Sequence, residues 1–305
     1  MSRVRKLAWA MALLLCLAVI GAAYFWARPV SVFDEVSELR LIVSGARSQS
    51  VRVGQIRVHY YVMGPETGPP VVLVHGLGGR AENWDNLAPY LAKAGYRVYL
   101  PDLPGYGQSE KPSDFSYSVP DEAAAVAGLM DALGLKQVDL GGWSMGGWIV
   151  QEIAANHPER VKRLLLFDSA GVYAKPEWNT ALFTPVNAQE IAELDALLMP
   201  NPPRVPAFVA RDILRLSNQN GWVVRRALAS MLTGRDATDK LLPKLRMPVL
   251  IVWGSEDHIT PVSLGNTIHN LVPQSQLDVI QGCGHLAPSQ CAAEIAPVVI
   301  AFLKQ

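Results

Sequence analysis

The sequence predicts an α/β fold, in which helices cover both faces of a mostly parallel sheet, with one apolar helix ahead of it. Six short, almost wholly apolar segments recur along the chain, and helical stretches lie between them. Strands of a parallel sheet that is buried on both faces form continuous apolar runs of this kind. The expected strands are Val71–Val74, Arg97–Leu100, Gln137–Leu140, Leu164–Phe167, Val249–Trp253 and Leu277–Ile280.

The other elements divide the chain into a sheet domain and an insertion. Residues 51–62 alternate around Gly54 as a hairpin does, and helices are expected over 121–133, 145–157 and 290–303. About eighty residues after Asp168 contain no clear buried strand, which predicts a helical insertion and not a loop. Its helical patterns are Ala188–Leu198, Ala207–Leu216 and Trp222–Leu232. The expected organisation is a core at 51–170 and 240–305 and a helical cap at 171–239.

Composition excludes several classes of protein. The chain has 305 residues, no formal net charge, 50% apolar residues and three cysteines. The apolar content excludes an intrinsically disordered chain, and the zero net charge argues against a nucleic-acid partner. Three cysteines exclude a disulfide-rich scaffold, and no Cys-x-x-Cys pair indicates zinc. We therefore expect neither a metal nor an organic cofactor.

The first thirty residues predict a membrane anchor. Arg3, Arg5 and Lys6 precede an uncharged stretch from Leu7 to Trp26, which as a helix spans roughly 30 Å, the thickness of a hydrocarbon core. The basic start favours a single-pass helix with the rest of the chain on the non-cytoplasmic side. A cleaved signal peptide, with a secreted product, is the alternative, and a buried core helix is a third interpretation. Residues 31–50 are expected to form a short helical or flexible linker.

The strongest local motif is Gly142-Trp143-Ser144-Met145-Gly146, which follows a predicted strand and opens a predicted helix. In this context the glycines allow a sharp turn that holds the serine above the sheet as a nucleophile. The backbone N–H of Met145, at the start of the helix, is then placed to stabilise an oxyanion. The alternative is a glycine-rich turn around a buried serine that has no chemical role.

A serine nucleophile needs a base, and the base needs an orienting carboxylate. His285 follows the last predicted strand, and Asp257 follows the strand ending at Trp253. Both therefore lie at the sheet edge that carries Ser144, and the order Ser, Asp, His agrees with the motif. Asp168, at another strand end, is the alternative acid.

The second oxyanion donor is expected in the glycine-rich loop His75-Gly76-Leu77-Gly78-Gly79, which follows the first buried strand. Leu77 is the expected donor and Gly78 the alternative, while His75 is expected to brace the loop and not to act as a base. A plain glycine turn is the interpretation without function.

Together these residues resemble the α/β-hydrolase family, over about residues 51–305. The segments that carry the resemblance are His75-Gly76, Asp102–Ser109, Gly142–Gly147, Gly254–Asp257 and Gly284-His285. The run Ser144–Gly147, the run Glu82–Trp84 and the N-terminal anchor are similar to bacterial family V lipases and to membrane-anchored monoacylglycerol lipases. Trp143 departs from this pattern, because those lipases more often carry Asn there.

The resemblance implies an α/β-hydrolase fold with a cap insertion and a serine esterase activity on small ester or lipid substrates. Monoacylglycerols and short- or medium-chain acyl esters are the expected substrates. The side chains expected to contact substrate are Trp143, Phe183, Leu198 and Trp222. The alternatives are a carbon–carbon bond hydrolase or cofactor-free haloperoxidase on the same fold, and a non-catalytic membrane-tethered binding protein. Cys283 and Cys291 flank His285, and we expect them to be free buried thiols, with a disulfide as the alternative.

Overall fold

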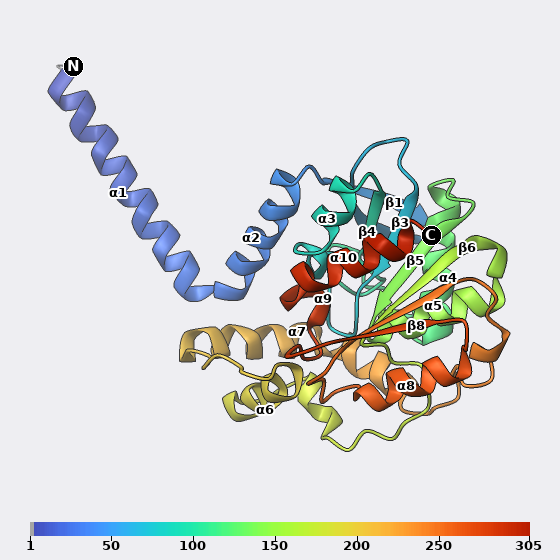
Figure 1. Ribbon diagram of the computed structural model, residues 1–305. Helices are drawn as coiled ribbons and strands as arrows, with labels where there is room; N and C mark the ends of the chain where they lie inside the picture. Colours follow the sequence, from blue (N-terminus) through green and yellow to red (C-terminus); the bar gives the residue numbers. More distant parts are fainter. Residues whose placement is uncertain (1–2) are drawn as a thin grey trace.

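The computed structural model describes residues 3–305, and an eight-stranded, mostly parallel sheet forms its centre (Figure 1). The strand order is β1-β2-β4-β3-β5-β6-β7-β8. Only the pairs β1–β2 and β2–β4 are antiparallel, so the predicted fold class is confirmed. The strands are β1 Arg47–Val53, β2 Ile56–Met63, β3 Pro70–Val74, β4 Arg97–Pro101, β5 Val138–Trp143, β6 Val161–Phe167, β7 Val249–Gly254 and β8 Gln276–Ile280.

Alternation along the strands explains how helices cover both faces. Val72 and Val74 of β3 pack in one buried cluster, and Val71 and Leu73 pack in the other. The first cluster includes side chains of α4 (Val119–Ala132), α5 (Met145–Asn156) and α8 (Val262–Leu271). The second includes side chains of α3 (Ala88–Lys93) and α10 (Ala292–Leu303). Because both faces are covered, the strands carry the uniformly apolar pattern from which they were predicted.

The insertion between β6 and β7 contains two main helices, α6 (Ala188–Leu198) and α7 (Ala207–Met231). We expected two separate helical segments where α7 is continuous, and that expectation was wrong. Residues 218–220 form a polar, exposed turn of the helix, which interrupts the apolar pattern but not the backbone. Gly221 is buried, and a Cβ there would lie 3.1 Å from the Thr184 side chain, so the glycine permits close packing and does not mark the end of a helix.

Two helices precede the sheet. The first, α1 (Arg3–Ala27), extends away from the body, and its window Trp9–Ala27 is long and apolar enough to cross a membrane, with none of it buried (Figure 1). A buried core helix is therefore excluded, while an anchor and a signal sequence both fit. Residues 1 and 2 of the predicted anchor lie outside the described part of the chain.

The predicted linker at 31–50 is mostly helix. The helix α2 (Pro29–Val43) packs on the body through the fully buried Leu41, and β1 begins at Arg47. The junction of α1 and α2 contacts α7. The Trp26 ring, near the end of α1, stacks on Phe208 at 4.5 Å between centroids, and the Val30 N–H, at the start of α2, donates to Asp212 at 3.1 Å. Because β1 begins at Arg47, the first strand of the hairpin predicted at 51–62 is longer than expected.

Cys283 and Cys291 form a disulfide, so the expectation of free thiols was wrong. The short helix α9 (Ala287–Gln290) turns the chain back and leaves their Cα atoms 6.4 Å apart, within the range that a disulfide can span. This turn could not be recognised from the spacing of the two cysteines. The disulfide closes the loop that carries His285.

Candidate active site

Ser144 lies in a sharp turn between β5 and α5, with a positive φ of 55°. Two glycines make the turn possible. A Cβ on Gly142 would lie 2.1 Å from the Gly146 carbonyl oxygen, and a Cβ on Gly146 would lie 2.3 Å from the Val74 carbonyl oxygen. Both contacts are far inside van der Waals distance, so any larger residue would displace the backbone that holds Ser144.

Ser144, His285 and Asp257 form a continuous hydrogen-bonded chain. The Ser144 Oγ lies 2.9 Å from His285 Nε2, and His285 Nδ1 lies 2.8 Å from Asp257 Oδ2. All three are buried. We assign the proton to Nδ1, because Asp257 can only accept there when ionised, and Nε2 is then free to accept the serine proton.

Backbone and hydroxyl donors fix the Asp257 carboxylate. The N–H groups of Ile259 and Thr260 donate to Oδ1 at 2.8 and 2.9 Å, and the Thr260 hydroxyl lies 2.7 Å from Oδ2. Sequence reasoning missed Thr260. Its position three residues after Asp257, where a hydroxyl side chain can close a tight turn, was the available signal.

No hydrogen bond joins the Asp168 side chain to the His285 ring. Its Oδ1 accepts the N–H of Gly254 at 2.7 Å, and its side chain is fully buried beside the Asp257 loop. Of the two candidate acids, Asp257 is therefore the one that is hydrogen-bonded to the imidazole.

The loop after β3 lies against the serine, since a Cβ on Gly76 would stand 3.0 Å from the Ser144 Cβ. Leu77 lines the same pocket as Ser144. Met145 is the first residue of α5, so its N–H has no acceptor within the helix. The His75 Nδ1–H donates to the Gly76 carbonyl at 2.8 Å, and Nε2 accepts the Leu103 N–H at 3.1 Å. Burial lowers the pKa of His75, so it is neutral and braces the loop as predicted.

A pocket of about 880 Å³ opens onto Ser144. The sheet domain and the insertion both line it, including Leu77, Trp148, Trp178, Phe183, Leu228 and Met231. Its wall is largely apolar and aromatic, as in pockets that hold small apolar ligands.

Of the four side chains expected to contact substrate, Phe183 lines this pocket, and Trp143, Leu198 and Trp222 do not. The Trp143 indole N–H donates to the His285 backbone carbonyl at 2.7 Å, so Trp143 fixes the backbone of the histidine. Trp222 packs edge-on against Tyr117, with ring centroids 5.5 Å apart. Leu198 ends α6, and its carbonyl packs against Gly284.

A second Ser–His–Asp chain shows that connectivity alone does not define a site. The Ser48 Oγ lies 2.8 Å from His59 Nε2, and His59 Nδ1 lies 2.8 Å from Asp102. Asp102 also accepts backbone N–H groups of Ala81 and Gln108, so it ties two loops together. Ser48 lies within strand β1, not at a helix N-terminus, and it lines neither pocket described here. We interpret this chain as structural.

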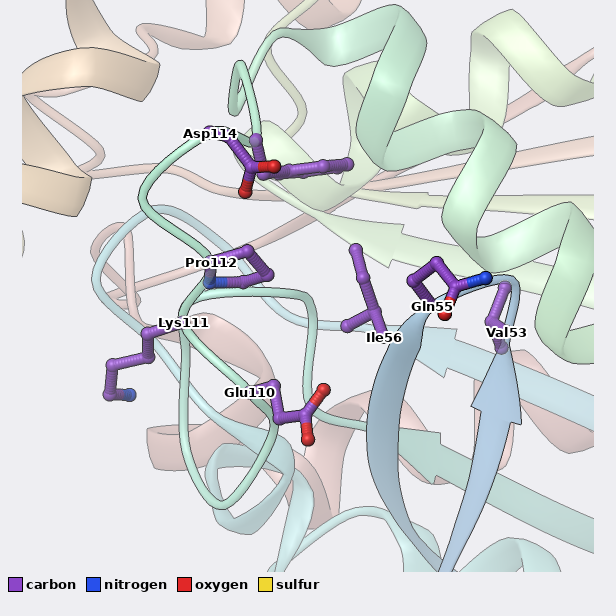
Figure 2. A pocket seen from close by; sticks show the side chains of 8 residues that line it. Val53, Gln55, Ile56, Glu110, Lys111, Pro112 and Asp114 are labelled. Carbon is purple, nitrogen blue, oxygen red and sulfur yellow. The ribbon is translucent and has the colours of Figure 1, made fainter.

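A shallow pocket of about 570 Å³ lies between the β1–β2 turn and the loop at residues 110–115 (Figure 2). Gln55 and Ile56 form one wall, and Glu110, Lys111 and Pro112 form the other (Figure 2). None of the predicted site residues lines it. Among residues 3–305, no cluster of three or more His, Cys, Asp or Glu side chains could hold a metal ion.

Comparison with known proteins supports the assignment of the fold family. The profile of the alpha/beta hydrolase fold matches residues 69–201 and 214–290. Lipase 3 of Moraxella sp. (strain TA144) is 31% identical over 77% of this chain and 78% of its own length. The 2-hydroxymuconate semialdehyde hydrolase of Pseudomonas sp. (strain CF600) is 32% identical over 78% of this chain and 88% of its own.

The solved structure of a bacterial membrane phospholipase A is 29% identical, with a TM-score of 0.82, and the match covers 98% of both chains. The lipase relative agrees with the prediction of a carboxylic ester hydrolase. On the profile match, the sheet topology and the serine turn, the chain belongs to the α/β-hydrolase fold family.

Proposed function

We propose that this chain is a serine hydrolase that cleaves carboxylic esters through Ser144, His285 and Asp257. The observation that carries the proposal is the hydrogen-bonded chain from Asp257 through His285 to Ser144, which ends at an apolar pocket. Ser48 has the hydrogen-bonded histidine and aspartate but does not line a pocket described here, so it lacks the second feature.

In the proposed reaction, the Ser144 oxygen attacks the ester carbonyl while His285 Nε2 takes the serine proton. Asp257 keeps the proton on Nδ1 and stabilises the imidazolium. The N–H groups of Leu77 and Met145 bind the oxyanion, each contributing about 3–4 kcal/mol to transition-state stabilisation. The intermediate then expels the alcohol, which receives the proton from Nε2. Water attacks the acyl-enzyme by the same route and releases the carboxylic acid and free Ser144.

Lipid-derived esters, such as monoacylglycerols, and short- or medium-chain acyl esters are the proposed substrates. The pocket volume of about 880 Å³ and its aromatic wall suit an acyl chain. The apolar helix α1 is joined to the insertion through Trp26 and Phe208, which would bring the pocket near a lipid surface. The match to a membrane phospholipase A extends over this N-terminal region and supports the same substrate class.

We propose that α1 stays in the membrane as a single-pass anchor, with the catalytic domain on the non-cytoplasmic side. The Cys283–Cys291 disulfide supports this side, because disulfides persist mainly in oxidising compartments. Secretion after cleavage of the same segment is the alternative. The mass of the mature N-terminal peptide separates the two.

A carbon–carbon bond hydrolase is the second candidate. The 2-hydroxymuconate semialdehyde hydrolase is 32% identical to this chain, and Lipase 3 is 31% identical, so sequence identity does not favour either. A cofactor-free haloperoxidase or a non-catalytic binding protein would use the same scaffold.

The test compares kcat/KM of the full-length protein for p-nitrophenyl esters of increasing acyl length with kcat/KM for a 2-hydroxy-6-oxodienoate. We expect ester turnover, and a loss of at least ~10³-fold in His285→Gln but not in the exposed-histidine control His157→Gln. Preferred cleavage of the dienoate would overturn the ester assignment.

A further inference from the structure

Asp168 is a buried carboxyl group that the proposed mechanism does not use. It directly follows β6, its side chain is completely buried, and its backbone has a positive φ of 42°. Oδ1 accepts the Gly254 N–H at 2.7 Å. Oδ2 is also buried, and no hydrogen-bond donor among residues 3–305 reaches it. A carboxylate with an unsatisfied buried oxygen would be very unfavourable.

The group next to this carboxyl is another carboxyl. Asp257 lies within hydrogen-bonding reach of Asp168 and is its charged neighbour. The backbone carbonyl of Asp168 also lies 3.0 Å from the Thr260 hydroxyl, which in turn lies 2.7 Å from Asp257. Two adjacent buried carboxyls cannot both ionise at low cost, so one of them is expected to hold a proton.

The distribution of donors decides which carboxyl is protonated. Asp257 faces four donor groups: the N–H groups of Ile259 and Thr260, the Thr260 hydroxyl and the His285 Nδ1–H. Asp168 faces only the Gly254 N–H. Burial, and then the Asp257 charge, raise the pKa of Asp168 well above its usual range. The negative charge therefore belongs to Asp257 and the proton to Asp168.

Other charged groups do not change this balance. Glu256 and His258, on the same loop as Asp257, are exposed. β7 contributes a backbone N–H at Gly254, and the start of α5 contributes the Ser144 carbonyl, which accepts the Ala170 N–H. His285 is hydrogen-bonded to the Asp257 carboxylate, and no hydrogen bond joins it to the Asp168 side chain.

We infer that Asp168 is held as a neutral carboxylic acid that donates a hydrogen bond from Oδ2 to Asp257, and that it is a positioning residue for the catalytic carboxylate. This inference rests on the proposed function. The donated hydrogen bond fixes the Asp257 side chain in the rotamer that contacts His285. It also reduces the negative charge density on the Asp257 carboxylate. The pair then carries one negative charge, the amount needed to stabilise one imidazolium.

Two variants test the charge state through the pH profile of kcat/KM. Asp168→Asn places an N–H where the acid has its O–H, while Asp168→Ala removes the donor. In Asp168→Ala we expect kcat/KM to fall about tenfold and the acid limb of its pH profile to move about one pH unit higher. Asp257 loses a hydrogen-bond donor in this variant and therefore stabilises the His285 imidazolium more strongly. Asp168→Asn is expected to restore the limb to its wild-type position.

An ionised Asp168 predicts the opposite result. Removing its negative charge in Asp168→Asn would weaken the imidazolium and move the acid limb to lower pH, which would overturn the inference. A loss of melting temperature in Asp168→Ala with an unchanged profile would also overturn it, because Asp168 would then be merely structural. Asp114→Asn, at an exposed aspartate, is the matched control.

A readout without turnover separates this inference from the proposed function. At pH 7 the infrared spectrum of the full chain should contain carbonyl stretches of protonated carboxylic acids, and Asp168→Asn should remove the band of Asp168 while that of the buried Glu122 remains. If no ester is cleaved but the band behaves in this way, the proposed function fails and the charge state of Asp168 stands. If Asp168→Asn leaves the spectrum unchanged in that region, the inference is overturned whatever the activity.

Discussion

At Gly146, the space occupied by one methyl group decides whether the serine turn can form. A Cβ there would meet the carbonyl oxygens of Val74 and His75 at 2.3 and 2.5 Å. We predict that Gly146→Ala loses about 100-fold or more in kcat/KM, since small displacements of a nucleophile have effects of this size. Gly21→Ala, in an open part of α1, is the control and should behave as the wild type. Equal activity of both variants would show that the turn is not under this constraint.

Glu122 is a second buried acid, and it links stability to pH. Both carboxyl oxygens lack a partner among the described residues, and burial raises the pKa of Glu122 well above its usual range. The folded protein therefore keeps a proton that the unfolded chain releases above about pH 4–5. Stability is lost as pH rises from there toward the folded pKa.

We predict that Glu122→Met melts at a higher temperature than the wild type at pH 8, and that this difference shrinks toward pH 5. Thermal melts across this range, with the exposed Glu159→Met as control, provide the measurement. A difference that does not vary with pH would mean that Glu122 ionises as freely in the fold as in the unfolded chain.

The placement of Ser144, Asp257 and His285 could be predicted because each follows a recognisable apolar strand. Parallel strands bring such residues to one edge, and the three side chains do meet there. Their catalytic roles stay predictions. Thr260 was missed although its hydroxyl side chain three residues after Asp257 was an available signal. The Trp143–His285 bond and the Asp168–Asp257 pair could not be predicted, because they depend on loop conformation and on side-chain directions. For the same reason, three of the four expected substrate contacts lie outside the pocket.

At the scale of elements, the Cys283–Cys291 disulfide braces the loop that carries His285. Closing a loop of this size is expected to stabilise the fold by about 2–3 kcal/mol. We predict that Cys283→Ala with Cys291→Ala lowers the free energy of unfolding by that amount and reduces kcat severalfold. Cys16→Ala, at the exposed free cysteine of α1, is the control. Retention of full stability and full kcat would mean that α9 and α10 hold the loop without the disulfide.

Asp212 of α7 ties the N-terminal helices to the insertion. Its side chain is fully buried, accepts the Val30 N–H at 3.1 Å and pairs with Arg215 at 2.8 Å. We predict that Asp212→Asn destabilises the fold by about 1–3 kcal/mol and speeds proteolysis between α1 and α2, because the buried carboxylate loses the charge that pairs with the partly exposed Arg215. Melting temperature and limited proteolysis measure the two effects, with Asp114→Asn as control. Unchanged proteolysis would show that aromatic stacking alone holds the junction.

Element boundaries were predictable where apolar periodicity is uninterrupted. The core strands and α6 fall where the sequence placed them. The bounds of α7 and of the α2 region were not predicted correctly, because they depend on tertiary contacts. The polar turn at residues 218–220 is stabilised within a longer helix, and α2 is ordered by packing of Leu41 against the body. Local pattern contains neither kind of information.

At the scale of the whole molecule, the structure joins three parts that the sequence could only place in order. The sheet presents the serine turn, the insertion closes the pocket above it, and α1 and α2 approach the insertion through Phe208 and Asp212 (Figure 1). Under the proposed function, one arrangement anchors the enzyme and directs its pocket toward lipid esters. The central claim is that Ser144 alone is the activated serine.

The most direct test of that claim is labelling of the full-length protein in detergent by a fluorophosphonate, with the adduct located by peptide mass spectrometry. We predict one adduct, on Ser144, that is lost in Ser144→Ala and kept in Ser48→Ala, although Ser48 has the same connectivity. An adduct on Ser48 in the Ser144→Ala variant, or an ester-cleaving protein without an adduct on Ser144, would contradict the account.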